Sequence, residues 1–203
     1  MNFLGHLYLS GNHHDIMMAN LYGDFVKGTD YTYLPKIVQE GVTLHRKIDD
    51  FIDKNPLILQ FLNDTLYKEL PKVAPIAIDL YMDHLLAKNW KQFHTQSLNN
   101  FTKSFFKYAL NPLNQVFDEE GSTFTYPNEF ILLLQLMDEK SWLLRYKKLE
   151  GLNMAATGLS KRISFENNLH TATLVYKKHE IKIKYVFYKF MEEAKVKFLD
   201  KKN

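Results

Sequence analysis

Apolar residues recur at helical spacing through most of the chain. A helix over residues 14–26 is predicted by this spacing, and Lys27-Gly28 supplies a basic last turn and a glycine C-cap. The same pattern predicts helices over 35–54, 57–67, 76–93, 98–117, 127–137, 141–149 and 153–163, with interruptions near Gly151 and Gly158. The last segment, about 166–198, is predicted to be helical because no partner exists for a strand, although residues 172–188 are rich in tyrosine and β-branched residues.

Composition agrees with an all-α fold. The chain has 203 residues, of which 46% are hydrophobic and 24% charged, with eight glycines and six prolines. These values predict one domain over residues 1–203, a helical bundle with a substantial core. The polar segment 118–126 is the expected loop.

The absence of cysteine excludes disulfides, thiolate metal sites and a cysteine nucleophile, and it fits a cytoplasmic location. No apolar run approaches the roughly 20 residues of a membrane span, and the N-terminus lacks the pattern of a signal peptide. We therefore expect a soluble cytoplasmic protein with no membrane partner.

Charge is distributed unevenly along the chain. The net charge is +3, with +6 in residues 161–203 and −3 in residues 1–160. The predicted C-terminal helix is therefore basic. Such a helix can meet an acidic partner, nucleic acid or a membrane surface, but a solvated lysine face is the simplest interpretation.

The stretch from Leu44 to Asp53 has the richest chemistry. His45, Asp49 and Asp53 lie on one helical stripe at i, i+4 and i+8. An imidazole and a carboxylate one turn apart can bind one divalent cation. A solvated polar face with internal ion pairs explains the same spacing, so this stretch alone does not decide between the two.

A second helix adds further acids and a histidine. Asp79 and Asp83 are one turn apart in an apolar segment, and His84 is offset from Asp83 by about 100°. Two buried charges must be offset by a bound cation or by a basic side chain such as Arg46. With a basic side chain, the residues form a purely structural ion-pair cluster. Asp24 lies in the last turn of the helix predicted over residues 14–26, where an acid opposes the helix macrodipole. An acid at this unfavourable position slightly favours a functional role for Asp24.

These three segments together favour a metal site. Imidazole and carboxylate ligands without thiolates suit Mn²⁺, Mg²⁺, Fe²⁺ or Zn²⁺ in a helical bundle. Such a cation polarises a phosphoryl oxygen and lowers the pKa of bound water, and Arg46 can contact a phosphate oxygen. The chain has no glycine-rich phosphate loop, no G-x-S-x-G elbow and no H-E-x-x-H helix. Hydrolysis of a phosphate ester is the chemistry that this pattern indicates.

Four motifs then carry a family resemblance. In chain order they are Asn2-Phe3-Leu4-Gly5-His6-Leu7, Gly23-Asp24-Phe25-Val26-Lys27-Gly28, His45-Arg46-Lys47-Ile48-Asp49 and Asp79-x-x-x-Asp83-His84-x-Leu86-Ala87-x-x-Trp90. Over about residues 1–160 the chain resembles the bacterial acyl carrier protein phosphodiesterases. It departs from their pattern at Gly5, where alanine is usual, and at residues 153–158, which lack an early arginine after Met-Ala.

The resemblance implies a divergent, HD-like metal phosphohydrolase that removes 4′-phosphopantetheine from holo-acyl carrier protein. It implies a divalent cation, Mn²⁺ first, with Mg²⁺ or Fe²⁺ as alternatives. The implied metal ligands are Asp24, His45, Asp83 and His84. The implied catalytic residues are Asp24, Arg46, Asp49 and Asp79, with Asp49 and Asp79 as further ligands or orienting groups. His6 is an additional polar candidate that a core hydrogen bond explains equally well.

The expected partner is an acidic carrier protein and not a nucleic acid. Basic residues that can meet it are Lys27, Arg46, Arg145, Lys161 and Arg162. Two alternatives remain open from the sequence. One is a metal phosphohydrolase acting on a nucleotide or another small phosphodiester, and the other is a non-enzymatic helical binding module.

Overall fold

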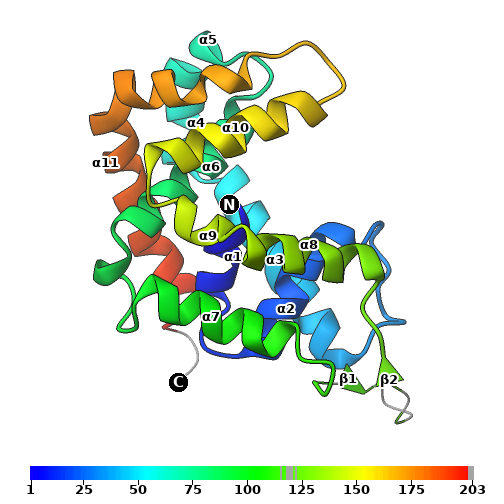
Figure 1. Cartoon of the computed structure of the whole chain (residues 1–203). Coiled ribbons are helices and arrows are strands. Elements are labelled where there is room, and N and C mark those ends of the chain that lie inside the picture. The colour runs from blue at the N-terminus through cyan, green and yellow to red at the C-terminus, as the bar shows by residue number, and fades with distance from the viewer. Residues whose placement is uncertain (115, 118–120, 122, 201–203) are drawn as a thin grey trace.

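The computed structural model describes residues 1–114, 116–117, 121 and 123–200, and its helices pack on one hydrophobic core (Figure 1). The first half contains α1 (Phe3–Leu9), α2 (His14–Tyr22), the 3₁₀ turn η1 (Gly23–Phe25), α3 (Lys36–Asp53), α4 (Pro56–Phe61), the π-helical turn η2 (Leu62–Leu66), α5 (Tyr67–Glu69), α6 (Ala74–Lys88) and η3 (Trp90–Gln92). The second half contains α7 (Leu98–Ala109), β1 (Val116–Phe117), β2 (Thr123–Phe124), α8 (Asn128–Glu139), α9 (Trp142–Arg145), α10 (Leu149–Arg162), η4 (Leu169–Thr171) and α11 (Ala172–Phe198). The predicted all-α, single-domain bundle is confirmed. Within the described ranges, no helix is both long and apolar enough to cross a membrane.

Helix α6 lies at the centre of the core. Leu80, Tyr81 and Met82 have no exposed surface, because apolar residues cover this helix on all sides. It contacts α1, α10 and α11. The Tyr81 hydroxyl also donates a hydrogen bond of 2.7 Å to the carbonyl of Ala172 at the start of α11. The central helix therefore fixes the elements that surround the candidate site.

Two predicted boundaries are wrong in the middle of the chain. The helix expected to reach residue 117 ends at Ala109, because Pro112 disfavours the α conformation at the residue before it. Residues 116–117 instead pair antiparallel with 123–124. Of the loop expected at 118–126, residues 118–120 and 122 lie outside the described residues.

The interruptions expected near Gly151 and Gly158 are also absent, because both glycines lie inside α10. A Cβ at Gly151 would lie 2.0 Å from the carbonyl oxygen of Arg145. Glycine therefore permits a close approach between the start of α10 and the end of α9. This approach closes one side of the cleft described below.

The C-terminal segment is helical, as predicted, but α11 begins at Ala172 and not near residue 166. Val186, Phe190 and Ala194 recur every four residues and are buried. On a helix, residues four apart form one continuous apolar stripe. On a strand, every second residue shares a face, so the same spacing would leave the residues between them on that face without a buried partner. Burial of the stripe therefore overrides the strand preference of the β-branched residues.

Candidate metal centre and cleft

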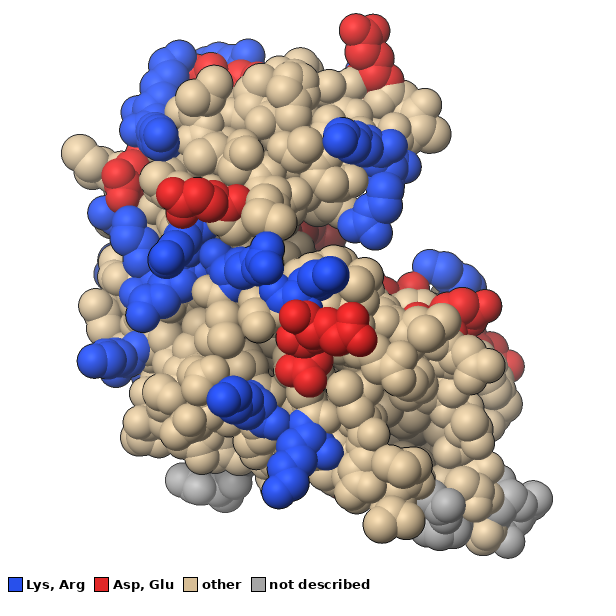
Figure 2. Space-filling view, in the orientation of Figure 1, with Lys and Arg blue, Asp and Glu red and all other residues tan. Residues whose placement is uncertain are grey.

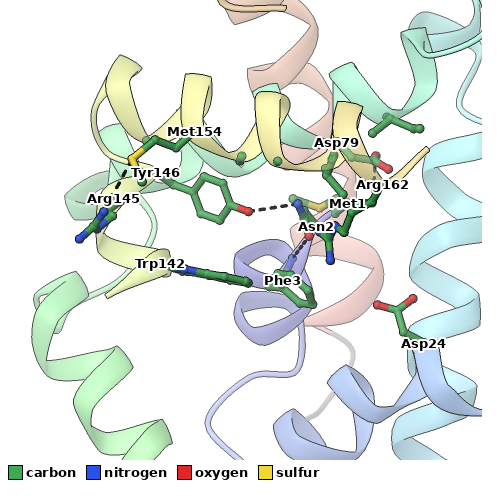
Figure 3. A pocket seen from close by; sticks show the side chains of 15 residues that line it. Met1, Asn2, Phe3, Asp24, Asp79, Trp142, Arg145, Tyr146, Met154 and Arg162 are labelled. Carbon is green, nitrogen blue, oxygen red and sulfur yellow. Dashed lines mark hydrogen bonds and ion pairs between the residues drawn. The ribbon is translucent and has the colours of Figure 1, made fainter. Parts of the chain in front are cut away.

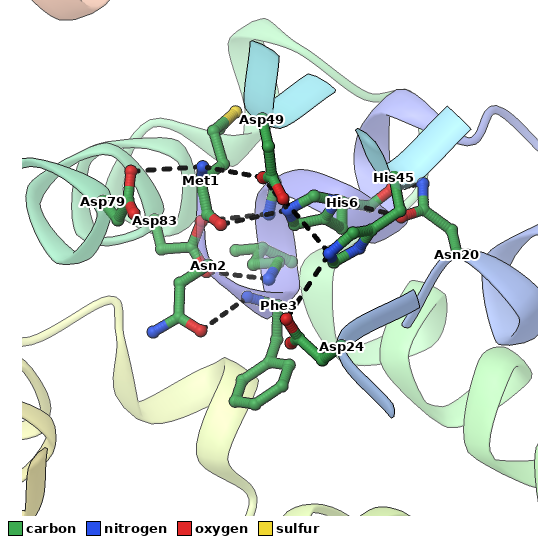
Figure 4. A network of polar contacts seen from close by, with 12 residues as sticks. Met1, Asn2, Phe3, His6, Asn20, Asp24, His45, Asp49, Asp79 and Asp83 are labelled. Atoms are coloured by element: carbon green, nitrogen blue, oxygen red, sulfur yellow. Dashed lines mark hydrogen bonds and ion pairs between the residues drawn. The ribbon is translucent and has the colours of Figure 1, made fainter. Parts of the chain in front are cut away.

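The carboxylate of Asp49 contacts two stacked histidine rings, with one oxygen toward each (Figure 4). Its Oδ1 is 3.1 Å from His6 Nε2, and its Oδ2 is 3.2 Å from His45 Nε2. The two rings stack with their centroids 4.3 Å apart. One ligand atom from each of the three residues lies within 4.8 Å of the others. This group, contributed by α1 and α3, can hold a metal ion, and we call it the His-Asp triad.

The position of His45 depends on the turn that follows α2. A Cβ at Gly23 would lie 2.4 Å from His45 Cγ, so only glycine leaves room for the ring. The next residue, Asp24, has its Oδ1 3.4 Å from His45 Nε2. Its side chain is 61% exposed, so this carboxylate connects the triad to solvent. Asp24 lies in η1, directly after the C-terminal end of α2, so its carboxylate still faces the negative end of that helix dipole.

The two histidines differ in their protonation. Burial alone would lower the pKa of His45, but hydrogen bonds to Asp24 and Asp49 raise it to about 9. Its Nδ1 is buried and has no hydrogen-bond partner among the described residues, so the carboxylates face Nε2 alone. Burial lowers the pKa of His6 despite its contact with Asp49. At neutral pH, His45 is therefore protonated and His6 neutral.

The hydrogen bonds of His6 fix its tautomer. Its Nδ1 lies 2.9 Å from Oδ1 of Asn20, and the Asn20 amide group donates to the His6 carbonyl and to Ser10 Oγ. Nδ1 is therefore the donor, and Nε2 carries a lone pair. This lone pair faces Asp49 and the carbonyl of Met1, which is 3.0 Å away. An imidazole lone pair beside a carboxylate, with the second imidazole nitrogen held by an amide, fits the needs of a divalent cation.

The amino group of Met1 lies between Asp79 and the triad residue Asp49 and contacts both. This buried amino group is 3.1 Å from Asp79 Oδ1 and 3.9 Å from Asp49 Oδ1. Burial would lower its pKa, but the carboxylates of Asp79, Asp49 and Asp83 raise it above its usual value. The structure thus brings four of the predicted residues to one region: Asp24, His45, Asp49 and Asp79.

The structure does not bring Asp83 and His84 into this group as ligands. Asp83 is fully buried, and its two oxygens accept hydrogen bonds of 2.7 and 3.0 Å from the backbone N–H groups of Leu4 and Gly5 in the first turn of α1. His84 points elsewhere, because adjacent side chains diverge by about 100° on a helix. Its Nδ1 is 2.7 Å from the carbonyl oxygen of Tyr146 at the end of α9. Asp83 therefore anchors α1, and His84 anchors α9.

Arg46 was expected to contact phosphate, but its guanidinium group is already engaged. It donates to the carbonyls of Val26 and Gly28 at 3.3 and 2.6 Å and lies 4.6 Å from the centre of the Tyr31 ring. These contacts hold the chain that follows Asp24. As the residue after His45, it points away from the stripe that carries Asp49.

A cleft of about 660 Å³ opens beside the triad (Figure 3). Its volume is within the range of roughly 300–1,000 Å³ for small-molecule sites. The lining residues are Met1, Asn2, Phe3, Asp24, Ile76, Asp79, Trp142, Arg145, Tyr146, Gly151, Met154, Ala155, Gly158, Leu159 and Arg162. In Figure 3, Asp24, Asp79 and Arg162 lie toward one end, and Trp142, Arg145 and Met154 lie toward the other. The cleft therefore runs from the acids beside the triad to an end formed by Trp142, Met154 and the charged Arg145.

Sequence reasoning gave too little weight to His6. It lies in an apolar run with no acid at helical spacing, so local patterns cannot pair it with Asp49. The one available signal was its presence in the first of the four family motifs. The contribution of Tyr146 and Gly158 to a cleft was also not expected, because that cleft exists only when α9 and α10 pack against α1.

The chain is similar to known proteins over most of its length. A family model described as acyl carrier protein phosphodiesterase matches residues 1–194. Relatives named acyl carrier protein phosphodiesterase from Salmonella dublin, Salmonella newport and Salmonella heidelberg are each 31% identical over 162 residues, which cover 80% of this chain and 79% of theirs. No solved structure matches the chain. The chain belongs to the acyl carrier protein phosphodiesterase family.

Proposed function

We propose that this protein is a phosphoric diester hydrolase that acts on holo-acyl carrier protein. Water attacks phosphorus, the bond from phosphorus to the serine oxygen breaks, and the serine oxygen takes up a proton. The products are apo-carrier protein and 4′-phosphopantetheine. The observation that carries the proposal is the position of the His-Asp triad at the acidic end of a cleft, in a chain of this family.

The proposal includes a divalent cation, Mn²⁺ first, held by His6, His45 and Asp49. Nitrogen and oxygen donors without thiolates suit Mn²⁺, with Mg²⁺ and Fe²⁺ as alternatives. When bound, the cation would polarise a phosphoryl oxygen and lower the pKa of bound water. Asp83 and His84 are not included as ligands, because both Asp83 oxygens accept hydrogen bonds from α1 and His84 Nδ1 contacts the carbonyl of Tyr146 after α9.

The chain's own residues supply the remaining chemistry. Asp24 is exposed on the cleft wall, so its free carboxylate oxygen can orient the attacking water and accept its proton. Arg162 lines the same part of the cleft and offers a guanidinium group for the phosphate oxygens. It replaces Arg46 in this role, because Arg46 is held by the carbonyls of Val26 and Gly28.

The proposed partner is a small acidic protein. Around α9 and at the end of α10 the exposed basic residues are Arg145, Lys147, Lys148, Lys161 and Arg162. Figure 2 shows Lys and Arg side chains over much of one face of the molecule, with acidic side chains among them. Charges at the rim of an interface chiefly raise the association rate with a partner of opposite charge. A cytoplasmic location belongs to the same proposal.

The activity can be tested with purified protein, Mn²⁺ and holo-acyl carrier protein. We expect apo-carrier protein and free 4′-phosphopantetheine, detected by mass spectrometry, and loss of both products after chelation of the metal. A panel of nucleotides and small phosphodiesters, measured under the same conditions, should give lower kcat/KM values. Stoichiometric metal without any release of phosphopantetheine would contradict the proposal.

Metal binding should release a proton, because the imidazole of His45 must be neutral to act as a ligand. Its pKa of about 9 lies above the ordinary value of 6.5, so the group is protonated at pH 7. The affinity for Mn²⁺ should therefore rise with pH, by up to about tenfold per unit, and level off near pH 9. Calorimetric titrations at pH 7 in buffers of different ionisation enthalpy measure the proton directly. Equal heats in all buffers would contradict this protonation state.

A further inference from the structure

The side of the cleft away from the triad has a surface suited to a chain that alternates between apolar and polar groups. Met154, Ala155 and Leu159 of α10 form one apolar wall, and Phe3 and Trp142 contribute aromatic rings. Figure 3 places Tyr146 between the Asp24 end and the Met154 end. Apolar walls with a few fixed polar groups are typical of small-molecule sites.

A polar pair lies within these apolar walls. Asn2 Nδ2 donates to the Tyr146 hydroxyl at 3.1 Å, and Asn2 Oδ1 accepts from the N–H of Phe3 at 2.9 Å. Because the Tyr146 oxygen acts as an acceptor here, its own hydrogen can be donated to a ligand carbonyl. Tyr146 is itself held from behind by His84, which lies 2.7 Å from its carbonyl oxygen. The hydroxyl is therefore a pre-positioned hydrogen-bond donor.

Gly158 leaves the middle of α10 without bulk on this side. A Cβ at this position meets no atom of the described chain within 4 Å, so the cleft is open there. The contrast with Gly151 is informative, because there the same Cβ would lie 2.0 Å from the Arg145 carbonyl. Gly151 serves packing, whereas the space beside Gly158 is available to a ligand.

We propose that this cleft is the binding site for the pantetheine arm of the substrate, and this rests on the proposed function. The phosphate lies at the end with Asp24 and Arg162, and the arm follows α10 past Gly158 toward Met154. The methylene and gem-dimethyl groups of the arm contact the apolar walls, and one of its amide carbonyls accepts from Tyr146. The cleft thus determines which phosphodiester reaches the triad.

A Gly158→Phe variant tests the assignment, because Gly158 lines the cleft and a Cβ at this position meets no atom of the described chain within 4 Å. We expect kcat/KM for holo-carrier protein to fall about 100-fold, since displacement of a bound substrate by about 1 Å already has an effect of this size. Gly158→Ala should stay within a few-fold of wild type. Asn153→Phe, on the same helix and exposed but outside the cleft lining, is the matched control and should leave kcat/KM unchanged. Thermal melting verifies that each variant folds.

Calorimetric titration with free 4′-phosphopantetheine tests the arm site without turnover. Wild type and Asn153→Phe should bind it, and Gly158→Phe should bind at least tenfold more weakly. If wild type binds the ligand but releases none from holo-carrier protein, the proposed function fails and the arm site stands. If wild type does not bind it, or if folded Gly158→Phe retains wild-type affinity, the arm site is overturned, whatever the activity.

Discussion

Replacing His45 with alanine should reduce kcat/KM for holo-carrier protein by about a thousandfold. The variant removes the imidazole that faces both Asp24 and Asp49, and with it one of three atoms of the proposed metal site. A bound cation supplies several kcal/mol of transition-state stabilisation, and about 4 kcal/mol corresponds to this factor. Steady-state kinetics with saturating Mn²⁺, together with the metal content of the purified variant, measure the effect.

Asp50→Ala is the matched control for His45→Ala. Asp50 lies on the same helix, is exposed, and pairs with Lys54 one turn away. Its loss should change kcat/KM by less than twofold, because an exposed ion pair of this kind contributes little. If His45→Ala retained more than a tenth of the wild-type activity with metal bound, His45 could not be a ligand.

Replacing Asp83 with alanine should lower the free energy of unfolding by about 2–6 kcal/mol. The change leaves the buried N–H groups of Leu4 and Gly5 without acceptors, and each costs about 1–3 kcal/mol. Asp83→Asn retains one acceptor oxygen and should cost less. Chemical denaturation at pH 7 measures both variants. Asp138→Ala, at an exposed carboxylate on α8, should stay within about 0.5 kcal/mol of wild type.

The pH dependence of the stability difference between wild type and Asp83→Asn tests the role of Asp83 as an anchor of α1. Burial raises the pKa of Asp83 to about 7, above its ordinary value of 3.8. The folded state therefore binds this proton more tightly than the unfolded state does, and the contribution of Asp83 to stability falls as pH rises from about 4 to 7. The stability of Asp83→Asn relative to wild type should increase over that range in metal-free protein. A difference independent of pH would contradict the raised pKa.

Local sequence rules succeeded where contacts are local. The pair of His45 and Asp49 was predicted because residues four apart share a helix face, and the structure has this contact. The contact of His6 with Asp49 joins α1 to α3 and depends on how two helices pack, so spacing along the chain does not contain it. The ends of helices follow the same division. Pro112 acts locally to end α7 early, while the identity of α11 is decided by burial against the core.

The predicted ligand roles of Asp83 and His84 depend on contacts that a sequence motif does not contain. Both residues are polar and buried, and both belong to the family motif that also contains Asp79. Metal ligands share these properties. Helical geometry separates them by about 100°, and each then meets a different neighbour. Motif membership identified residues that matter without specifying how they act, and Arg46 is a third case of this kind.

His84 connects the substrate cleft to the centre of the molecule. From α6 it holds the carbonyl of Tyr146, and the Tyr146 hydroxyl in turn meets Asn2 at the other wall. One side chain of the core helix thus sets the distance between α9 and α1. The triad depends on the same helix through a different residue, since Asp83 holds the first turn of α1, which carries His6. Sequence changes at the contact of His84 with Tyr146 can retune which substrates enter the cleft, while Asp83 keeps His6 in place.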